Sequence, residues 1–211
     1  MKKNHHNKNK RGFSLVELMV VMVILISMFG LVVTASQASK NQNTASTVVS
    51  LVAEIERHKQ AAASSNRTVW TYIGPSEADS SILTIQAWET NDGSATLTDQ
   101  NRKRSSRALR WKNVSLSDAD FSQTKRADVA ADARMRRALW LRFSPSGEVH
   151  AVAASENSEL SMPPTVAADL QTWWEFAIVP TQRGKVTQKS LDQHAIVQIS
   201  GLTGQSRWFM P

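Results

Sequence analysis

The chain has 211 residues, no cysteine and a formal charge of +7. The lack of cysteine excludes disulfides, thiolate nucleophiles and cysteine-ligated metal sites. Five of the basic residues precede Gly12, and without them 20 Lys and Arg residues face 18 Asp and Glu residues. Global basicity therefore does not indicate a nucleic-acid-binding protein, and the length suits one globular domain beside a membrane segment.

An apolar segment follows this basic leader. Residues 13–33 contain one strongly polar residue, Glu17, and a helix of that length rises about 30 Å, enough to cross the hydrocarbon core of a bilayer. Residues 1–12 carry positive charge only, which is typical of a cytoplasmic flank. The sequence predicts a single membrane-spanning helix with the rest of the chain on the far side, in an oxidising compartment.

Glu17 needs an explanation, because a carboxylate inside hydrocarbon costs about 2.5 to 3.5 kcal/mol and indicates a function and a partner. If the leader is removed after Gly12, the new α-amino group of Phe13 lies about one helical turn from Glu17 and is cationic below a pKa of about 8. Glu17 can then pair with the Phe13 amine of its own helix or of a neighbouring one.

Residues 12–18, Gly-Phe-Ser-Leu-Val-Glu-Leu, resemble the N-terminal segment of type IV pilins and type II secretion pseudopilins. The resemblance implies that a prepilin peptidase cleaves between Gly12 and Phe13 and methylates the new N-terminus at Phe13. It also implies that Glu17 pairs with the Phe13 amine of an adjacent subunit during assembly. A signal anchor, or a secretory signal peptide cleaved after Ala38, would leave Glu17 unexplained, and a cleaved signal usually has a shorter apolar region.

The helix is expected to continue past the membrane segment to Ser65, about 80 Å in all if it is unbroken. Apolar side chains recur at helical spacing at Val48, Leu51, Val52, Ile55 and Ala62. The polar face is expected to carry Glu54, Glu56, Arg57, His58, Lys59 and Gln60. Major pilins commonly have a proline where this chain has Thr34, and its absence favours a straighter helix and argues against a major pilin.

The rest of the chain reads as strands and turns. Strands are predicted at 68–73, 82–88, 108–111, 138–143, 148–153, 174–179 and 195–199, and a last turn at 201–204 precedes residues 207–209. Turns are predicted at 74–76, 91–93 and 144–147, loops at 89–107 and 155–168, and a loose helix at 117–137. With the resemblance, this predicts an α+β pilin-like fold, a long N-terminal helix on a small antiparallel sheet. The expected parts are leader 1–12, membrane helix 13–33, amphipathic helix 34–65 and β-rich domain 66–211.

Features of the body resemble the H-type minor pseudopilins and the FimT-like pilins. They are the Ser65-Asn66-Arg67 entry to the first strand, the 143–147 turn with Pro145 and Gly147, and the late segment from Thr203 to Arg207. FimT-like pilins active in DNA uptake carry a C-terminal Gly-Arg-x-Arg motif. This chain keeps Gly204 and Arg207 but has Gln205 at the position of the first arginine.

No catalytic or metal centre is predicted, and no cofactor. The body histidines, His58, His150 and His194, lack metal-ligand spacing, and the last two read as partly exposed strand residues without a paired nucleophile. Asp92 and Gly93 indicate a turn rather than a calcium loop. The seven tryptophans are expected to fill the core between helix and sheet in preference to a stacking surface.

Two arginine-rich clusters support a nucleic-acid alternative. The candidate contacts are Arg102, Lys103, Arg104, Arg107 and Arg207, with Arg110 and Lys112 beside Trp111. A second group is Arg134, Arg136 and Arg137. The competing interpretation is a solvated face offset by nearby aspartates.

The predicted function is a minor pilin-like structural subunit, not an enzyme, of a type II secretion or type IV pilus filament. Its expected partners are other pilins, through the N-terminal helix, and the prepilin peptidase. Its expected location is the bacterial inner membrane, with the leader cytoplasmic and the C-terminal domain periplasmic, and then a filament. The alternative is a FimT-like subunit that binds DNA during uptake.

Overall fold

The computed structural model describes residues 15–117, 134–135, 138–154, 162–163, 173–182, 184–187, 191 and 193–210. Within the helix, side chains are described at positions 15, 16 and 18–26 and again from Thr44. The chain divides into two compact units, residues 1–40 and 41–211. The predicted leader and its cleavage site lie outside the described residues.

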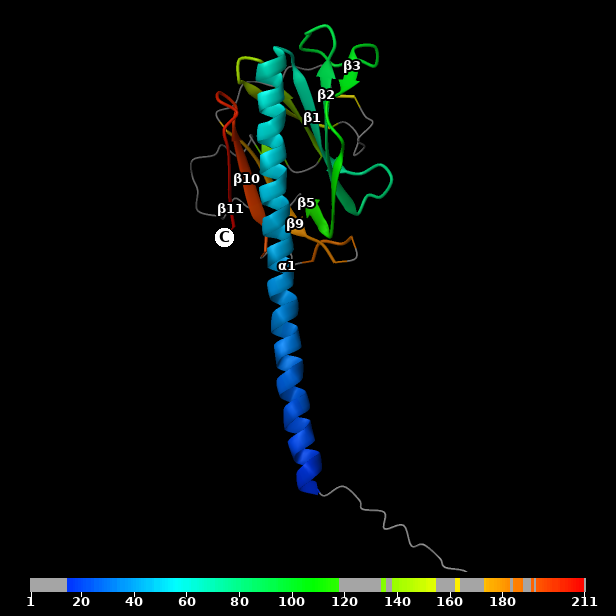
Figure 1. Cartoon of the computed structure of the whole chain (residues 1–211), viewed down its shortest axis with the longest axis vertical. Helices are drawn as coiled ribbons and strands as arrows, with labels where there is room; N and C mark the ends of the chain where they lie inside the picture. Colours follow the sequence, from blue (N-terminus) through cyan, green and yellow to red (C-terminus); the bar gives the residue numbers. More distant parts are fainter. Residues whose placement is uncertain are drawn as a thin grey trace, which may run out of the picture. The chain divides into compact units, whose positions relative to one another are not determined.

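The helix α1 spans Leu15–Ser65 and ends at the predicted position (Figure 1). Asn66 follows with a φ of 53°, in the left-handed region, and the backbone N–H of Arg67 then donates to the carbonyl of Ala62 at 3.2 Å. A left-handed residue with such a backward hydrogen bond is a common way to end a helix.

One sheet of the body is antiparallel throughout and contains β1 (Val69–Pro75), β2 (Ile82–Thr90), β3 (Arg102–Arg104), β4 (Leu109–Lys112), β7 (Leu139–Phe143) and β8 (Val149–Ala153). Its order is β3-β2-β1-β7-β8. Strand β4 also pairs with β2, at residues 82–85, whereas β3 pairs at residues 88–90. The two short strands therefore lie end to end along one edge of β2.

The second sheet contains β5 (Val114–Leu116), β6 (Arg134–Met135), β9 (Trp173–Pro180), β10 (Ala195–Ser200) and β11 (Ser206–Phe209). Its order is β11-β10-β9-β5, and β6 pairs with β9 in parallel. The chain crosses from β4 to β5 through a single residue, Asn113, with a φ of 62°. The β-domain thus has two sheets where one was predicted, because β4 and β5 belong to different sheets.

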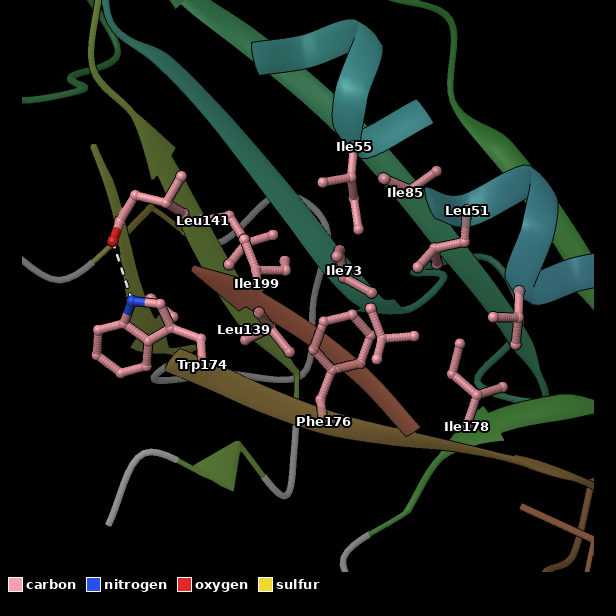
Figure 2. Packing of buried hydrophobic residues seen from close by; sticks show 14 of the residues in the cluster. Leu51, Ile55, Ile73, Ile85, Leu139, Leu141, Trp174, Phe176, Ile178 and Ile199 are labelled. Atoms are coloured by element: carbon pink, nitrogen blue, oxygen red, sulfur yellow. Dashed lines mark hydrogen bonds between the residues drawn. The ribbon is translucent and has the colours of Figure 1, made fainter. Parts of the chain in front are cut away.

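The main core is shared by α1 and both sheets (Figure 2). Leu51 and Ile55 point from the helix toward Ile73 and Ile85 of the first sheet. Phe176 of the second sheet is 2% exposed in the same cluster. The helical spacing predicted for positions 48, 51, 55 and 62 is confirmed, since all four side chains are fully buried.

The outer face of the first sheet carries a second, aromatic core. Trp70, Tyr72, Trp88 and Trp140 pack together, with ring centroids of Trp140 and its three neighbours 5.2–6.4 Å apart. The buried Leu97, from the loop after β2, closes over them. The expectation that the tryptophans fill the space between helix and sheet is therefore wrong for these three. They alternate with the residues that face the helix, so they occupy the opposite face.

The class α+β and the antiparallel pairing of β1 with β2 and β7 with β8 are confirmed. Two details are wrong. Gly74 and Pro75 belong to β1 rather than a turn. Gly74 packs closely against Tyr72 there, since a Cβ on Gly74 would overlap the Tyr72 hydroxyl. Residues 102–104 form a strand inside the predicted loop, because a sheet edge accommodates charged side chains. The predicted helix at 117–137 lies mostly outside the described residues. The described residues 134–135 of that segment form a strand, β6.

Candidate functional site

The first turns of α1 carry exposed apolar side chains. The described residues from Leu15 to Ile26 are all apolar, and their exposed fractions run from 45% at Leu25 to 76% at Leu15. Apolar surface of this extent in one segment indicates that another apolar phase or molecule covers it. The N-terminal unit is therefore a candidate site for a membrane or for partner helices.

The predicted membrane span is only partly covered by these residues. Among the described residues, no helix combines the length and apolar character needed to cross a bilayer. Phe13 lies outside the described residues, and so do the side chains of Glu17 and of positions 27–33. The span at 13–33 and the charge pair of Glu17 with Phe13 remain predictions.

A buried polar cluster joins α1 to the first sheet. The ring of His58 is 1% exposed, with Nδ1 3.0 Å from the Thr71 hydroxyl of β1. Its Nε2 lies 3.1 Å from a carboxylate oxygen of Glu54 and 3.1 Å from the hydroxyl of Ser106. Glu54 is 8% exposed and also pairs with Arg57. The prediction that Glu54 and His58 lie on the polar face of the helix is wrong, because both are buried: His58 contacts Thr71 and Ser106, and Glu54 contacts His58 and Arg57.

The carboxylate of Glu54 accepts hydrogen bonds only, so Nε2 of His58 carries the proton and Nδ1 accepts from Thr71. Burial lowers the pKa of His58 from 6.5 to about 4, and the nearby Glu54 carboxylate opposes that shift. His58 is therefore neutral at pH 7, and its basic nitrogen is already engaged by Thr71. This arrangement stabilises the contact between helix and sheet and leaves no base for nucleophilic catalysis at Ser106.

The basic residues proposed as nucleic-acid contacts fall in two places. Lys103, Arg104 and Arg107 are exposed on or beside β3, and Arg102 is partly exposed and paired with Asp99 at 3.2 Å. Arg207 lies apart from them, on β11. The group at 134–137 lies outside the described side chains.

Arg207 is held in place by residues of its own sheet. Its guanidinium carbon is 4.1 Å from the centroid of the Trp173 ring, and its Nε donates to the side-chain oxygen of Gln198 at 2.8 Å. Gln198 in turn donates to the buried Glu175 at 2.8 Å. The structure therefore does not bring Arg207 together with the basic residues of β3.

The remaining residues singled out in the sequence have local roles. His194 is buried, 5% exposed, with Nδ1 2.6 Å from the Leu191 carbonyl, so its predicted exposure is wrong. His150 lies in β8 and is half-buried. The carboxylate of Asp92 accepts hydrogen bonds from the Ser94 backbone and the Asn101 amide. No group of three or more potential metal ligands occurs among the described residues.

Comparison with protein families assigns the N-terminal segment. Residues 7–33 carry the prokaryotic N-terminal methylation motif. The motif supports the type IV pilin and pseudopilin class, whose members are structural rather than enzymatic. It implies processing by a prepilin peptidase, anchoring in a membrane and assembly with other pilins. Comparisons with curated proteins and with solved structures give no match.

Proposed function

We propose that this chain is a minor pilin-like structural subunit of a type II secretion or type IV pilus filament. The observation that carries the proposal is that the methylation motif at residues 7–33 contains the exposed apolar residues Leu15–Ile26. A subunit that moves from the membrane into a filament needs both features. The motif directs its processing, and the exposed apolar helix can pack on neighbouring subunits.

In this proposal the peptidase cleaves after Gly12 and methylates Phe13. The carboxylate of Glu17 is paired with the Phe13 amine of an adjacent subunit. Charge pairing in hydrocarbon favours the assembled state, because a lone carboxylate there is costly. The remaining apolar side chains, such as Leu18 and Leu25, pack between helices of neighbouring subunits.

The body is carried into the filament by the same helix. Residues 48, 51, 55 and 62 of α1 lie in the main core of the β-domain. Glu56 of α1 also accepts hydrogen bonds from Ser206 of β11, at 3.1 and 2.6 Å. Assembly through the N-terminal residues therefore displays the β-domain, whose surface would decide the neighbours of this subunit.

The contacts of the late turn support the H-type, FimT-like subclass. Gly204 has a φ of 63°, and a Cβ there would lie 3.1 Å from the carbonyl oxygen of Gly147. The two segments that carry the resemblance, 143–147 and 203–207, are thus packed against each other. The DNA-uptake alternative draws less support from the C-terminal motif, since Arg207 is bound to Trp173 and Gln198.

Replacement of Glu17 tests the assembly mechanism. Glu17→Ala should insert into the membrane at least as well as the native chain, because the charged group is removed, but should enter filaments poorly. Membrane fractionation measures insertion, and the amount of subunit in sheared filaments measures assembly. Glu17→Asp, which keeps a carboxylate at the same position, is the control and should enter filaments better than Glu17→Ala. Normal incorporation of Glu17→Ala would reject the charge-pair mechanism.

A further inference from the structure

Five basic side chains form a row along the β3–β4 edge of the first sheet. Even-numbered residues of β2 face away from the main core, since Leu83, Ile85 and Ala87 belong to that core. Arg102, Arg104, Arg110 and Lys112 lie opposite Thr90, Trp88, Thr84 and Ile82 respectively. Residues opposite each other in an antiparallel pair point to the same face. These four side chains therefore share the outer face, and Arg107 lies in the segment between the two strands.

The row is regular and long. Positions two residues apart on a strand are separated by about 7 Å, so the eight steps from Ile82 to Thr90 extend the row over about 27 Å. The segment from Arg102 to Lys112 contains no acidic residue. Arg104, Arg107 and Lys112 are exposed and form no salt bridge with another described residue. Asp99 pairs with Arg102. Hydrogen bonds from Ser81 lower the pKa of Asp79, and the charge of Lys112 contributes to the same shift.

We propose that this row binds the phosphodiester backbone of a nucleic acid. A linear array of cations matches a linear polymer with one negative charge at each repeat, and arginine is well suited to phosphate oxygens. The proposal goes beyond a structural role in a filament and does not depend on it. It also differs from a C-terminal site, because Arg207 is not part of the row.

Two observations select the phosphate backbone over other partners. An added β-strand would need a continuous edge, but β3 and β4 have three and four residues and are interrupted between Arg104 and Leu109. On the face of the row, the Trp88 ring beside Arg104 is 7% exposed. Trp111, between Arg110 and Lys112, belongs to the other face of β4 and packs against the main core. Bases therefore have no ring to stack on, so the row recognises charge and spacing without a base preference.

Fluorescence anisotropy with labelled 30-nucleotide single strands, one of thymine only and one of mixed sequence, tests the proposal. The protein is the full chain in neutral detergent micelles, measured with and without residues 1–12, because the leader carries five further positive charges. We expect the chain without residues 1–12 to bind, with similar affinity for the two sequences. If all five cations bind phosphates, the slope of log affinity against log salt concentration should be near −3.5, since each cation contributes about −0.7.

Two variants that each remove two positive charges separate the row from general basicity. Arg104→Gln with Lys112→Gln removes two exposed members of the row. Lys103→Gln with Lys185→Gln removes two exposed lysines outside it, since Lys103 lies opposite Glu89, on the other face of β3. We expect the first variant to weaken binding roughly 20-fold in 0.1 M salt and to reduce the slope by about 1.4, and the second to change affinity less than threefold.

Several results would overturn the proposal. The first is no binding in 50 mM salt, and the second is an equal loss of affinity in the two variants. The third is that phosphatidylglycerol in the micelles displaces DNA at a lower concentration of negative charge than unlabelled DNA does. The last result would identify a lipid surface as the ligand. Competition by inorganic polyphosphate at matched charge would support recognition of the backbone alone. Unchanged thermal unfolding of both variants excludes misfolding as the cause of a loss.

Discussion

The carboxylate of Glu56, on α1, accepts hydrogen bonds from the backbone N–H and the hydroxyl of Ser206, at the start of β11. The two residues are 150 positions apart in the chain. This contact ties the last strand of the domain to the helix that carries the methylation motif. It adds a polar connection to the apolar packing of the helix and does not involve the predicted assembly residues.

Loss of the Glu56 carboxylate should weaken the β-domain. We expect Glu56→Ala to lower the free energy of unfolding by about 1 to 3 kcal/mol, since hydrogen bonds to a charged group contribute that much. Urea unfolding followed by tryptophan fluorescence measures the change. A double-mutant cycle with Ser206→Ala should give a coupling energy above about 0.5 kcal/mol. Additive effects would show that the hydroxyl bond does not stabilise the domain, since Ser206→Ala keeps the backbone N–H donor.

Stability should fall in acid because of His58. The unfolded chain binds a proton on this residue near pH 6.5, whereas burial lowers the folded pKa to about 4. The unfolded state therefore holds more protons between these values, so stability is complete above pH 6.5 and is lost as the pH falls toward 4. The full loss is about 3 kcal/mol, since each pKa unit corresponds to 1.36 kcal/mol.

The pH window from 5 to 6.5 excludes most carboxylates, which titrate below it, and comparison with a His58 variant separates His58 from His150 and His194. His58→Gln keeps a donor and an acceptor near Glu54 and Thr71 but cannot titrate. In this variant, unfolding free energies measured by urea at several pH values should change little between pH 6.5 and 5. The same slope in both proteins would show that another group is responsible.

Gly204 should be intolerant of a side chain. A Cβ there would lie 3.0 Å from Lys59 on α1 and 3.0 Å from Val149 on β8, and the φ is 63°. We expect Gly204→Ala to cost about 2 to 3 kcal/mol, combining backbone strain with the displacement of packed neighbours. Gly93→Ala is the matched control, because its φ is 72° and nothing lies within 4 Å. Equal losses would mean that packing around Gly204 contributes nothing.

Trp140 anchors the aromatic core on the outer face of the first sheet. It is 1% exposed and contacts the rings of Trp70, Tyr72 and Trp88. We expect Trp140→Ala to cost about 3 to 5 kcal/mol in unfolding free energy. Trp208→Ala should cost much less, since Trp208 is 38% exposed. Similar values for both would argue against a packed second core.

Local patterns predicted most of the elements in this fold. Helical spacing identified the buried face from Val48 to Ala62, and alternation with a proline–glycine turn identified the β7–β8 hairpin. The predictions that were wrong concern residues whose positions depend on long-range contacts. His58 looks like a surface residue in the sequence because its partners Thr71 and Ser106 lie in other parts of the chain, and Glu54 is buried beside it.

The basic row illustrates the same limit at the candidate sites. The sequence shows a cluster of Arg and Lys residues, but only strand pairing places Arg104 and Lys112 on one face and Lys103 on the other. Likewise, the resemblance at Arg207 says nothing of Trp173, which binds it. The methylation motif at residues 7–33 could be recognised from the sequence because it is made of consecutive residues, whereas the roles of Gly12, Phe13 and Glu17 stay predictions.

The mature N-terminus tests the central claim most directly. Mass spectrometry of the protein purified from its native host, or from cells that also express a prepilin peptidase, gives its first residue and any methyl group. We predict a chain that begins with N-methylated Phe13 and a Gly12→Ala control that retains residues 1–12 as a precursor. A mature chain that keeps Met1, or one that begins near Ser39 after a cut at Ala38, would contradict the account.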